Sequence, residues 1–212
     1  MADELVLYTN PQSRGRIARW MLEEIGAPYR AEVLEYATTM KAAEYRAINP
    51  MAKVPALVHN GKVVTECAAI CVYLAEAFPQ AGLAPLPEER ADYYRWLFFG
   101  AGPVEQAMTN HYAAFHATEE QGQMFGYGSY DRVVDVLDEL LLSRAYIAGD
   151  RFTAADVYVG AQLSWGTMFG LLPKRDSFLA YVARIEAREA HQRASALDDA
   201  LMAERQTATE SA

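Results

Sequence analysis

The stretch "NPMAKVPALVHNGKVVTECAAICVYLAE", residues 49–76, decides the fold. It joins an extended segment containing Val54-Pro55, a turn at Asn60-Gly61 and a helix that opens at Glu66. Asn-Gly between two apolar runs is the favoured two-residue turn of a β-hairpin. This order places backbone hydrogen-bonding groups, a carboxylate and a helix N-terminus around one small cleft, which a peptide-like ligand would fit.

The residues before this stretch alternate between strand and helix patterns. "ELVLYT" at 4–9 and "YRAEVL" at 29–34 predict strands, and residues 14–25 between them predict a helix that Gly26 ends. A less regular segment at 42–48 precedes Pro55. The resulting order is strand, helix, strand, helix, two antiparallel strands, helix. This βαβαββα order is that of a thioredoxin-like domain.

The segment "FPQAGLAPLP", residues 78–87, carries three prolines and a glycine and predicts a connector between compact units. We place the boundary near residue 82, with a first domain at 1–80, a linker at 81–87 and a second domain at 88–212. Only helical periods follow the connector, so the second domain is predicted to be all helical. Its helices are expected at about 88–116, 129–144, 154–168 and 177–187, with a bend near Gly100, Gly102 and Pro103 and a polar, frayed tail from Ala203.

Composition excludes several classes of function. The formal net charge is -9 at pH 7, and no run of lysine or arginine exceeds two residues, so nucleic acid and anionic membranes are poor partners. No apolar run approaches the roughly 20 residues that span a bilayer, and the N-terminus does not have the form of a secretion signal. Cys67 and Cys71, the only cysteines, predict neither a disulfide framework nor a zinc site. We expect a soluble, cytoplasmic protein with reduced thiols, no metal and no tightly bound cofactor.

Three segments in order carry a family resemblance: "INPMAKVPAL" from residue 48, "TECAAICVYLAE" from residue 65 and "YIAGDRFTAADV" from residue 146. With them, the chain strongly resembles a cytosolic glutathione S-transferase of bacterial type up to about residue 190. "LYTNPQSRGRIARWMLEEIG", from residue 7, is similar to the first strand, loop and helix of the serine-type, theta-like classes. The resemblance implies an enzyme that conjugates the thiolate of reduced glutathione to a small apolar electrophile in detoxification.

The resemblance also implies a glutathione site. Val54, before a cis Pro55, would exchange backbone hydrogen bonds with the cysteinyl part of glutathione, and Lys53 would lie near the glycyl carboxylate. Glu66 would accept from the ligand's ammonium group, while N–H groups at the helix start hold the γ-glutamyl carboxylate. Lys53 as a solvated lysine and Glu66 as a complement to the helix dipole are the structural alternatives. Cys67 departs from the family's usual serine and offers only a weak S–H donor.

Ser13 occupies the position whose hydroxyl assists the thiol in the serine-type classes. A free thiol has a pKa of about 8.5, so lowering it by about two units requires roughly 2.7 kcal/mol of preference for the thiolate. Tyr8, the amides of Asn10 and Gln12, and the charge of Arg14 remain alternative contacts. A serine that merely caps the following helix is the structural alternative for Ser13.

The electrophile is expected between the two domains, against the first helices of the second one. Large apolar or amphipathic side chains there are candidates, although such residues in a helical domain usually form core. They are Met108, His111, Tyr112, Phe115 and Trp165. The resemblance suggests a homodimer. Two other functions stay open: glutathione-dependent thiol or peroxide reduction through Cys67, and a non-catalytic binding protein on the same fold.

Overall fold

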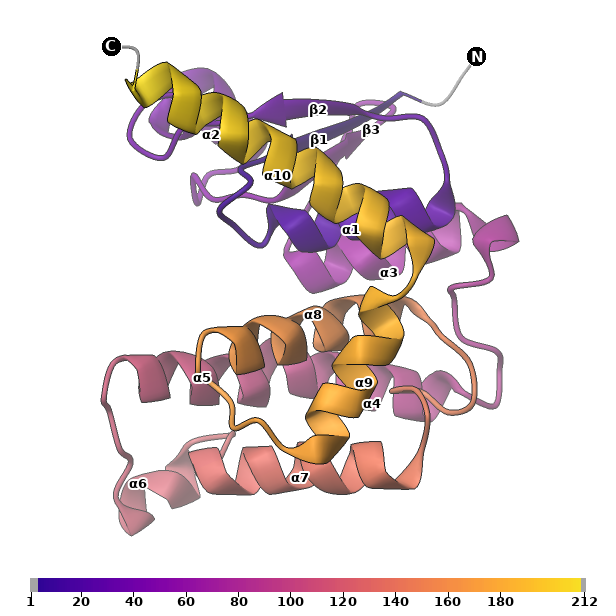
Figure 1. Cartoon of the computed structure of the whole chain (residues 1–212), viewed down its shortest axis with the longest axis vertical. Helices are drawn as coiled ribbons and strands as arrows, with labels where there is room; N and C mark the ends of the chain where they lie inside the picture. Colours follow the sequence, from indigo (N-terminus) through magenta and orange to yellow (C-terminus); the bar gives the residue numbers. More distant parts are fainter. Residues whose placement is uncertain (1–3, 211–212) are drawn as a thin grey trace. The chain divides into compact units, whose positions relative to one another are not determined.

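A computed structural model describes residues 4–210. The chain divides into two compact units, residues 1–82 with 187–212 and residues 83–186. The first unit contains a four-stranded sheet and its helices (Figure 1). Its elements up to the connector are β1 (Leu5–Thr9), α1 (Gly15–Ile25), β2 (Arg30–Val33), the short 3₁₀ helix η1 (Thr39–Lys41), α2 (Ala43–Ile48), β3 (Ala56–His59), β4 (Lys62–Thr65), α3 (Cys67–Ala77) and η2 (Pro79–Ala81). The predicted βαβαββα order is confirmed.

The sheet is mixed, with strand order β2-β1-β3-β4. β1 pairs in parallel with β2, and β3 pairs antiparallel with both β1 and β4. The turn between β3 and β4 holds Asn60 and Gly61 at φ values of 50° and 77°. Positive φ at both positions is what the favoured hairpin turn requires, and Asn-Gly adopts it at little cost.

Helix α1 packs its apolar face against the sheet and α3. The side chains of its apolar face are buried: Ala18, Met21, Leu22 and Ile25. Gly26 ends the helix in the left-handed region at φ 67°, and its N–H bonds to the Leu22 carbonyl at 3.1 Å. The loop between β1 and α1 therefore joins a buried central strand to a helix whose position is fixed by packing.

The second unit consists of helices. They are α4 (Arg90–Phe99), the π-helical turn η3 (Gly100–Val104), α5 (Glu105–Tyr112), α6 (Glu119–Met124), α7 (Tyr130–Ser143), α8 (Ala154–Met168) and α9 (Asp176–Glu186). The predicted interruption near residue 100 is confirmed as η3, which contains Pro103. A π turn widens the helix by one residue and frequently marks a functional position. α6 has no counterpart in the sequence prediction.

The last helix, α10 (Glu189–Glu210), belongs to the first unit and lies along α1 (Figure 1). This differs from the predicted second domain of residues 88–212. The frayed tail expected from Ala203 was also wrong, because residues 203–210 continue α10. A buried ion pair joins the two helices, with Arg19 Nε 3.0 Å from Asp198 Oδ1. A hydrophobic pattern could not predict this contact, because it places charged side chains on the surface.

Within residues 4–210, no helix is long and apolar enough to cross a membrane. The same residues contain no cluster of three or more histidine, cysteine or acidic side chains that could hold a metal ion. Both cysteines are free and buried.

Candidate functional site

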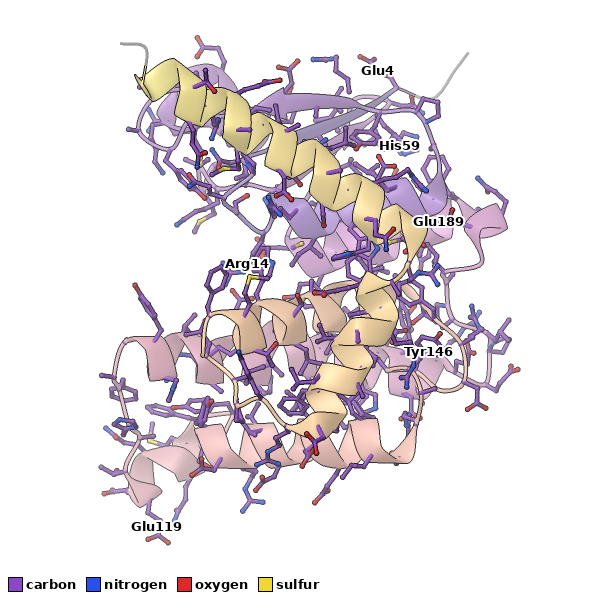
Figure 2. All side chains as sticks on the ribbon, viewed as in Figure 1. Glu4, Arg14, His59, Glu119, Tyr146 and Glu189 are labelled. Atoms are coloured by element: carbon purple, nitrogen blue, oxygen red, sulfur yellow. The ribbon has the colours of Figure 1, made fainter. Side chains whose placement is uncertain are left out.

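The loop between β1 and α1 carries the residues proposed for thiol chemistry. It begins at Asn10 and ends at Arg14, which Figure 2 labels at the start of α1. Ser13 is half-buried, and its backbone N–H donates to the Asn10 carbonyl at 3.1 Å. That bond closes the loop into a turn and holds the serine immediately before the helix.

The Ser13 hydroxyl forms two hydrogen bonds inside this turn. It donates to the Asn10 carbonyl at 2.7 Å and accepts from the Gly15 N–H at 2.9 Å. Its single proton is used within the loop, so contact with a thiolate requires the hydroxyl to turn away from that carbonyl. Gly15 leaves the necessary room, because a Cβ there would lie 2.9 Å from Ser13 Oγ and 2.0 Å from Thr9 Oγ1.

The alternative thiol contacts are placed less favourably. The Asn10 side chain is buried and already engaged at both ends, since its amide donates to the Leu34 carbonyl at 2.7 Å and its oxygen accepts from the Gln12 N–H at 2.9 Å. Tyr8 is part of β1, and its ring packs 5.5 Å from that of Tyr45, as expected for a core-lining role. The amide of Gln12 is exposed and stays an alternative.

Arg16, which the sequence did not single out, ties this loop to the C-terminal helix. Its Nε donates to the Pro11 carbonyl at 2.7 Å, and its Nη2 forms an ion pair with Asp199 of α10. The ion pair is partly solvated and contributes little energy alone. Its effect is positional, because the guanidinium group bridges the middle of the loop and a helix that packs on α1.

The segment before β3 is held by side chains that leave its edge available. The Lys53 carbonyl accepts from the Tyr45 hydroxyl at 2.5 Å and from the Asn49 amide at 2.8 Å, and Lys41 Nζ donates to the Ala52 carbonyl at 3.1 Å. The Val54-Pro55 peptide bond is cis, as the resemblance implied. Within residues 4–210, the N–H and C=O of Val54 have no hydrogen-bond partner.

Burial keeps the Tyr45 donor in its protonated form. The ring is 3% exposed, and desolvation raises the pKa of the phenol to about 12. The hydroxyl therefore donates to the Lys53 carbonyl at any physiological pH. The Lys53 side chain itself is exposed and has no fixed partner among residues 4–210. Its contact with a glycyl carboxylate stays a prediction.

The start of α3 provides an anion site of the predicted kind. Glu66 is exposed and adopts φ 64° and ψ 116°, an uncommon conformation for a residue with a side chain. No side chain caps this helix, so the first-turn N–H groups of Ala68 and Ala69 are available to an anion. Strained residues of this kind cluster at ligand sites.

Cys67 brings the two parts of the site together. Its Sγ lies 3.6 Å from the Arg14 carbonyl oxygen, which joins the start of α3 to the start of α1. The thiol is 9% exposed, and Cys71 is fully buried in the core. A packed, buried thiol is a poor partner for a mixed disulfide, so nothing favours the reductase alternative.

The predicted electrophile contacts do not converge within the second unit. Met108 is buried, Tyr112 is 82% exposed, and the His111 ring stacks on Tyr130 with centroids 4.2 Å apart. Trp165 is half-buried in α8. Of the five, only Phe115 lines a cavity of about 630 Å³ in this unit, whose other lining residues include Gln106, Asn110 and Tyr127. Their contact with a substrate stays a prediction.

Sequence reasoning missed the side chains that hold the site. Lys41, Tyr45 and Asn49 act through backbone carbonyls, and Arg16 acts through Pro11. Thr9 is fully buried, and its hydroxyl oxygen has no hydrogen-bond partner among the described residues. The polar residue at the end of the apolar strand "LVLYT" was the one available signal for Thr9.

Two family models match the chain. Residues 14–77 match the model described as "Glutathione S-transferase, N-terminal domain", and residues 104–189 match "Glutathione S-transferase, C-terminal domain". "Glutathione S-transferase D7" of Drosophila melanogaster is 32% identical over 124 residues. That alignment covers 57% of this chain, and it spans only 55% of the length of the relative.

Solved structures of bacterial proteins match most of the chain. The glutathione transferase of Methylococcus capsulatus is 28% identical, with a TM-score of 0.77, over 92% of this chain and 98% of the other. A sphingomonad glutathione S-transferase complexed with glutathione is 26% identical, with a TM-score of 0.75 and the same coverage. The fold and the family models therefore agree over both units.

Proposed function

Because this chain belongs to the glutathione S-transferase family and is a glutathione-using enzyme, we propose that Ser13 stabilises the glutathione thiolate for attack on a small apolar electrophile. The observation that carries the proposal is the position of the Ser13 hydroxyl, half-buried in the turn that leads into α1. It lies in the same unit as the unpaired Val54 backbone and the uncapped start of α3.

Each part of the site fits one part of the tripeptide. The N–H and C=O of Val54 suit the cysteinyl backbone, which would add as a short extended strand. The first-turn N–H groups of α3 suit the γ-glutamyl carboxylate, and Glu66 suits the ammonium group beside it. Cys67 replaces a hydroxyl with a weak donor, at a cost of about 1 kcal/mol if that contact matters.

The hydrogen bonds of Ser13 limit how far the thiol pKa can fall. A hydroxyl that donates to a charged sulfur contributes roughly 1.5 to 3 kcal/mol, and a helix N-terminus adds about 0.3 to 1. The hydroxyl gives up its bond to the Asn10 carbonyl, which costs about 1 kcal/mol. The net of about 1 to 3 kcal/mol corresponds to a pKa lowered by roughly 1 to 2 units.

Replacement of Ser13 by alanine tests this role. We expect the pKa of bound glutathione, followed by the ultraviolet absorbance of the thiolate, to rise by roughly 0.4 to 1.5 units, because the variant loses only the net hydroxyl contribution of about 0.5 to 2 kcal/mol and keeps that of the helix N-terminus. The affinity for glutathione should change less than about threefold, because the hydroxyl contacts only the sulfur. Gln12→Ala is the matched control, since that side chain lies in the same loop and is exposed. An unchanged thiol pKa in Ser13→Ala would remove Ser13 from the mechanism, and a raised one in Gln12→Ala would assign the role to the amide.

A cytoplasmic homodimer that acts in detoxification completes the proposal. Family membership supports the dimer, and a two-fold, isologous contact is the common arrangement. Two free cysteines fit a reducing compartment. Sedimentation of a monomer at micromolar concentration would contradict the dimer without affecting the role of Ser13.

A further inference from the structure

The phenol of Tyr45 joins α2 to the segment whose edge would receive glutathione. Tyr45 is 3% exposed, and its hydroxyl donates to the Lys53 carbonyl oxygen at 2.5 Å. The side-chain amide of Asn49, the residue that follows α2, donates to the same oxygen at 2.8 Å. A carbonyl oxygen has two lone pairs, so these two donors occupy it completely. The Lys53 carbonyl is therefore held in one direction from the buried side of the segment.

The Lys53 carbonyl belongs to the same peptide group as the Val54 N–H. This group is planar and trans, so its C=O and N–H point in opposite directions. Hydrogen bonds that fix the carbonyl toward Tyr45 therefore turn the Val54 N–H away from Tyr45. A donor on the carbonyl also polarises the peptide group, which strengthens its N–H as a hydrogen-bond donor. The Tyr45 hydroxyl thus controls both the direction and the strength of a donor that no described residue of 4–210 uses.

The Val54 side chain and the backbone before it depend on the same contacts. Val54 packs against a buried cluster that consists of Tyr45, Met40 and Ala56. Ala52 adopts φ 50°, a conformation that is uncommon for a residue with a Cβ. Such residues persist where the surrounding contacts determine the backbone, and they are frequent at ligand sites. The segment from Ala52 to Val54 is therefore shaped by the packing around Tyr45 and not by its own conformational preference.

We propose that the Tyr45 hydroxyl is a positioning group for glutathione, because it aims and strengthens the Val54 N–H that donates to the cysteinyl carbonyl of the ligand. The inference rests on the proposed glutathione site and is independent of Ser13. A buried hydroxyl that is bonded to the backbone does not touch the thiol, so it acts on binding and not on thiol ionisation. The contact through Val54 is the same before and during the reaction, so its loss raises KM and leaves kcat unchanged.

Tyr45→Phe tests the inference, because it removes the hydroxyl and keeps the ring that packs against Tyr8. The probe is S-methylglutathione, titrated by calorimetry, which has the tripeptide backbone but no thiol for Ser13 to stabilise. We expect its dissociation constant to rise roughly three- to tenfold in the variant. The KM for glutathione should rise by the same factor, whereas kcat and the pKa of the bound thiol should stay as in the native chain.

A second probe separates the effect on the Val54 N–H from general support of the structure. Replacing the cysteinyl carbonyl of S-methylglutathione by a thiocarbonyl gives a weaker hydrogen-bond acceptor at the atom that faces this N–H. The replacement should weaken binding to the native chain by a larger factor than binding to Tyr45→Phe, because the variant has already lost part of that bond. Equal factors in the two chains would show that Tyr45 only supports the structure and would overturn the inference.

Tyr130→Phe is the matched control. Tyr130 also donates its hydroxyl to a backbone carbonyl, that of Leu171 at 2.9 Å, but it belongs to the helical unit. This variant should bind S-methylglutathione as the native chain does, although it loses a comparable hydrogen bond. Asn49→Asp removes the other donor to the Lys53 carbonyl and keeps an oxygen for the Met51 N–H. It replaces Tyr45→Phe if that variant fails to fold, and it should show the same difference between the two probes.

Amide hydrogen exchange of Val54 in the native chain tests the shared premise without any substitution. S-methylglutathione should slow this exchange at least roughly tenfold. Absence of that protection would overturn both the glutathione site and the role of Tyr45. Protection in the native chain together with equal affinity in Tyr45→Phe would overturn the role of Tyr45 alone and leave that of Ser13 intact.

Discussion

Asp156, in the first turn of α8, offers a test of how burial and hydrogen bonding compete in the helical unit. The carboxylate is completely buried and accepts four hydrogen bonds, from the backbone N–H groups of Ile147 and Thr153, both at 2.8 Å, and from the hydroxyls of Thr153 at 3.2 Å and Tyr181 at 2.7 Å. Thr153 and Asp156 form a capping box at the start of α8.

Burial outweighs these bonds and raises the pKa of Asp156 from 3.8 to about 6. The folded chain therefore holds this proton at pH values where the unfolded chain has lost it. The stability that depends on the proton is fully present below pH 3.8 and is lost as the pH rises through 6. The pKa of Tyr181 is raised well above its ordinary value, first by burial, so its hydroxyl remains a donor throughout.

The magnitude follows from the two pKa values of Asp156. Their difference of about 2.2, at 1.36 kcal/mol each, gives about 3 kcal/mol over the whole window, of which about 2 kcal/mol falls between pH 4.5 and 7.5. The amide introduced by Asp156→Asn cannot titrate. The free energy of unfolding of the native chain minus that of the variant therefore isolates the pH dependence that is due to Asp156. We expect that difference to fall by about 2 kcal/mol as the pH rises from about 4.5 to about 7.5.

Urea unfolding followed by tryptophan fluorescence at a series of pH values measures the difference. Asp131→Asn is the matched control, because Asp131 occupies the first turn of α7 but is exposed. Its difference curve should be flat within about 0.5 kcal/mol. A flat curve for Asp156→Asn, or one that rises with pH, would show that the hydrogen bonds outweigh burial and would refute the reasoning.

Two predictions concern α1. Gly15→Ala should lower the rate of glutathione conjugation with a chromogenic aryl halide at least roughly tenfold, because the new Cβ collides with Thr9 Oγ1 and crowds the Ser13 hydroxyl. Adding Thr9→Ala removes the collision and should restore part of the rate. No recovery in the double variant would contradict the steric cause. Arg19→Met should destabilise the chain by about 3 to 5 kcal/mol, because Asp198, whose pKa burial already raises, keeps its charge without a partner. The double variant with Asp198→Leu should regain most of that stability in urea unfolding, and a cost below about 1 kcal/mol for the single variant would argue against a buried pair.

Much of the candidate site could be read from local pattern. The hairpin at Asn60-Gly61, the helix end at Gly26 and the break near Pro103 each depend on residues adjacent in the chain, and each lies where it was predicted. Glu66 was singled out because it stands where the predicted hairpin meets a helix, whereas the family resemblance singled out Ser13. The family resemblance, and not the pattern, supplied the cis bond before Pro55 and the roles in binding glutathione.

Other features depend on contacts that no local pattern records. α10 returns to α1 through Arg19 and Asp198, which lie 179 positions apart, and a rule that buries apolar residues would place both on the surface. The cavity of the helical unit joins Asn110 to Tyr127 across an intervening helix, and Phe115 lines it although the sequence assigned that residue to another site.

Periodicity and turn chemistry specify elements because side-chain direction and backbone preference depend on a few neighbouring residues. The primary sequence was therefore enough for the order of strands and helices, for the two architectural halves and for the loop that holds Ser13. The three-dimensional packing alone established which charges are buried in pairs, which carbonyls are already occupied and where a cavity remains. Those properties arise from side chains distant in the chain, whose desolvation and hydrogen bonding are settled only when the elements pack together.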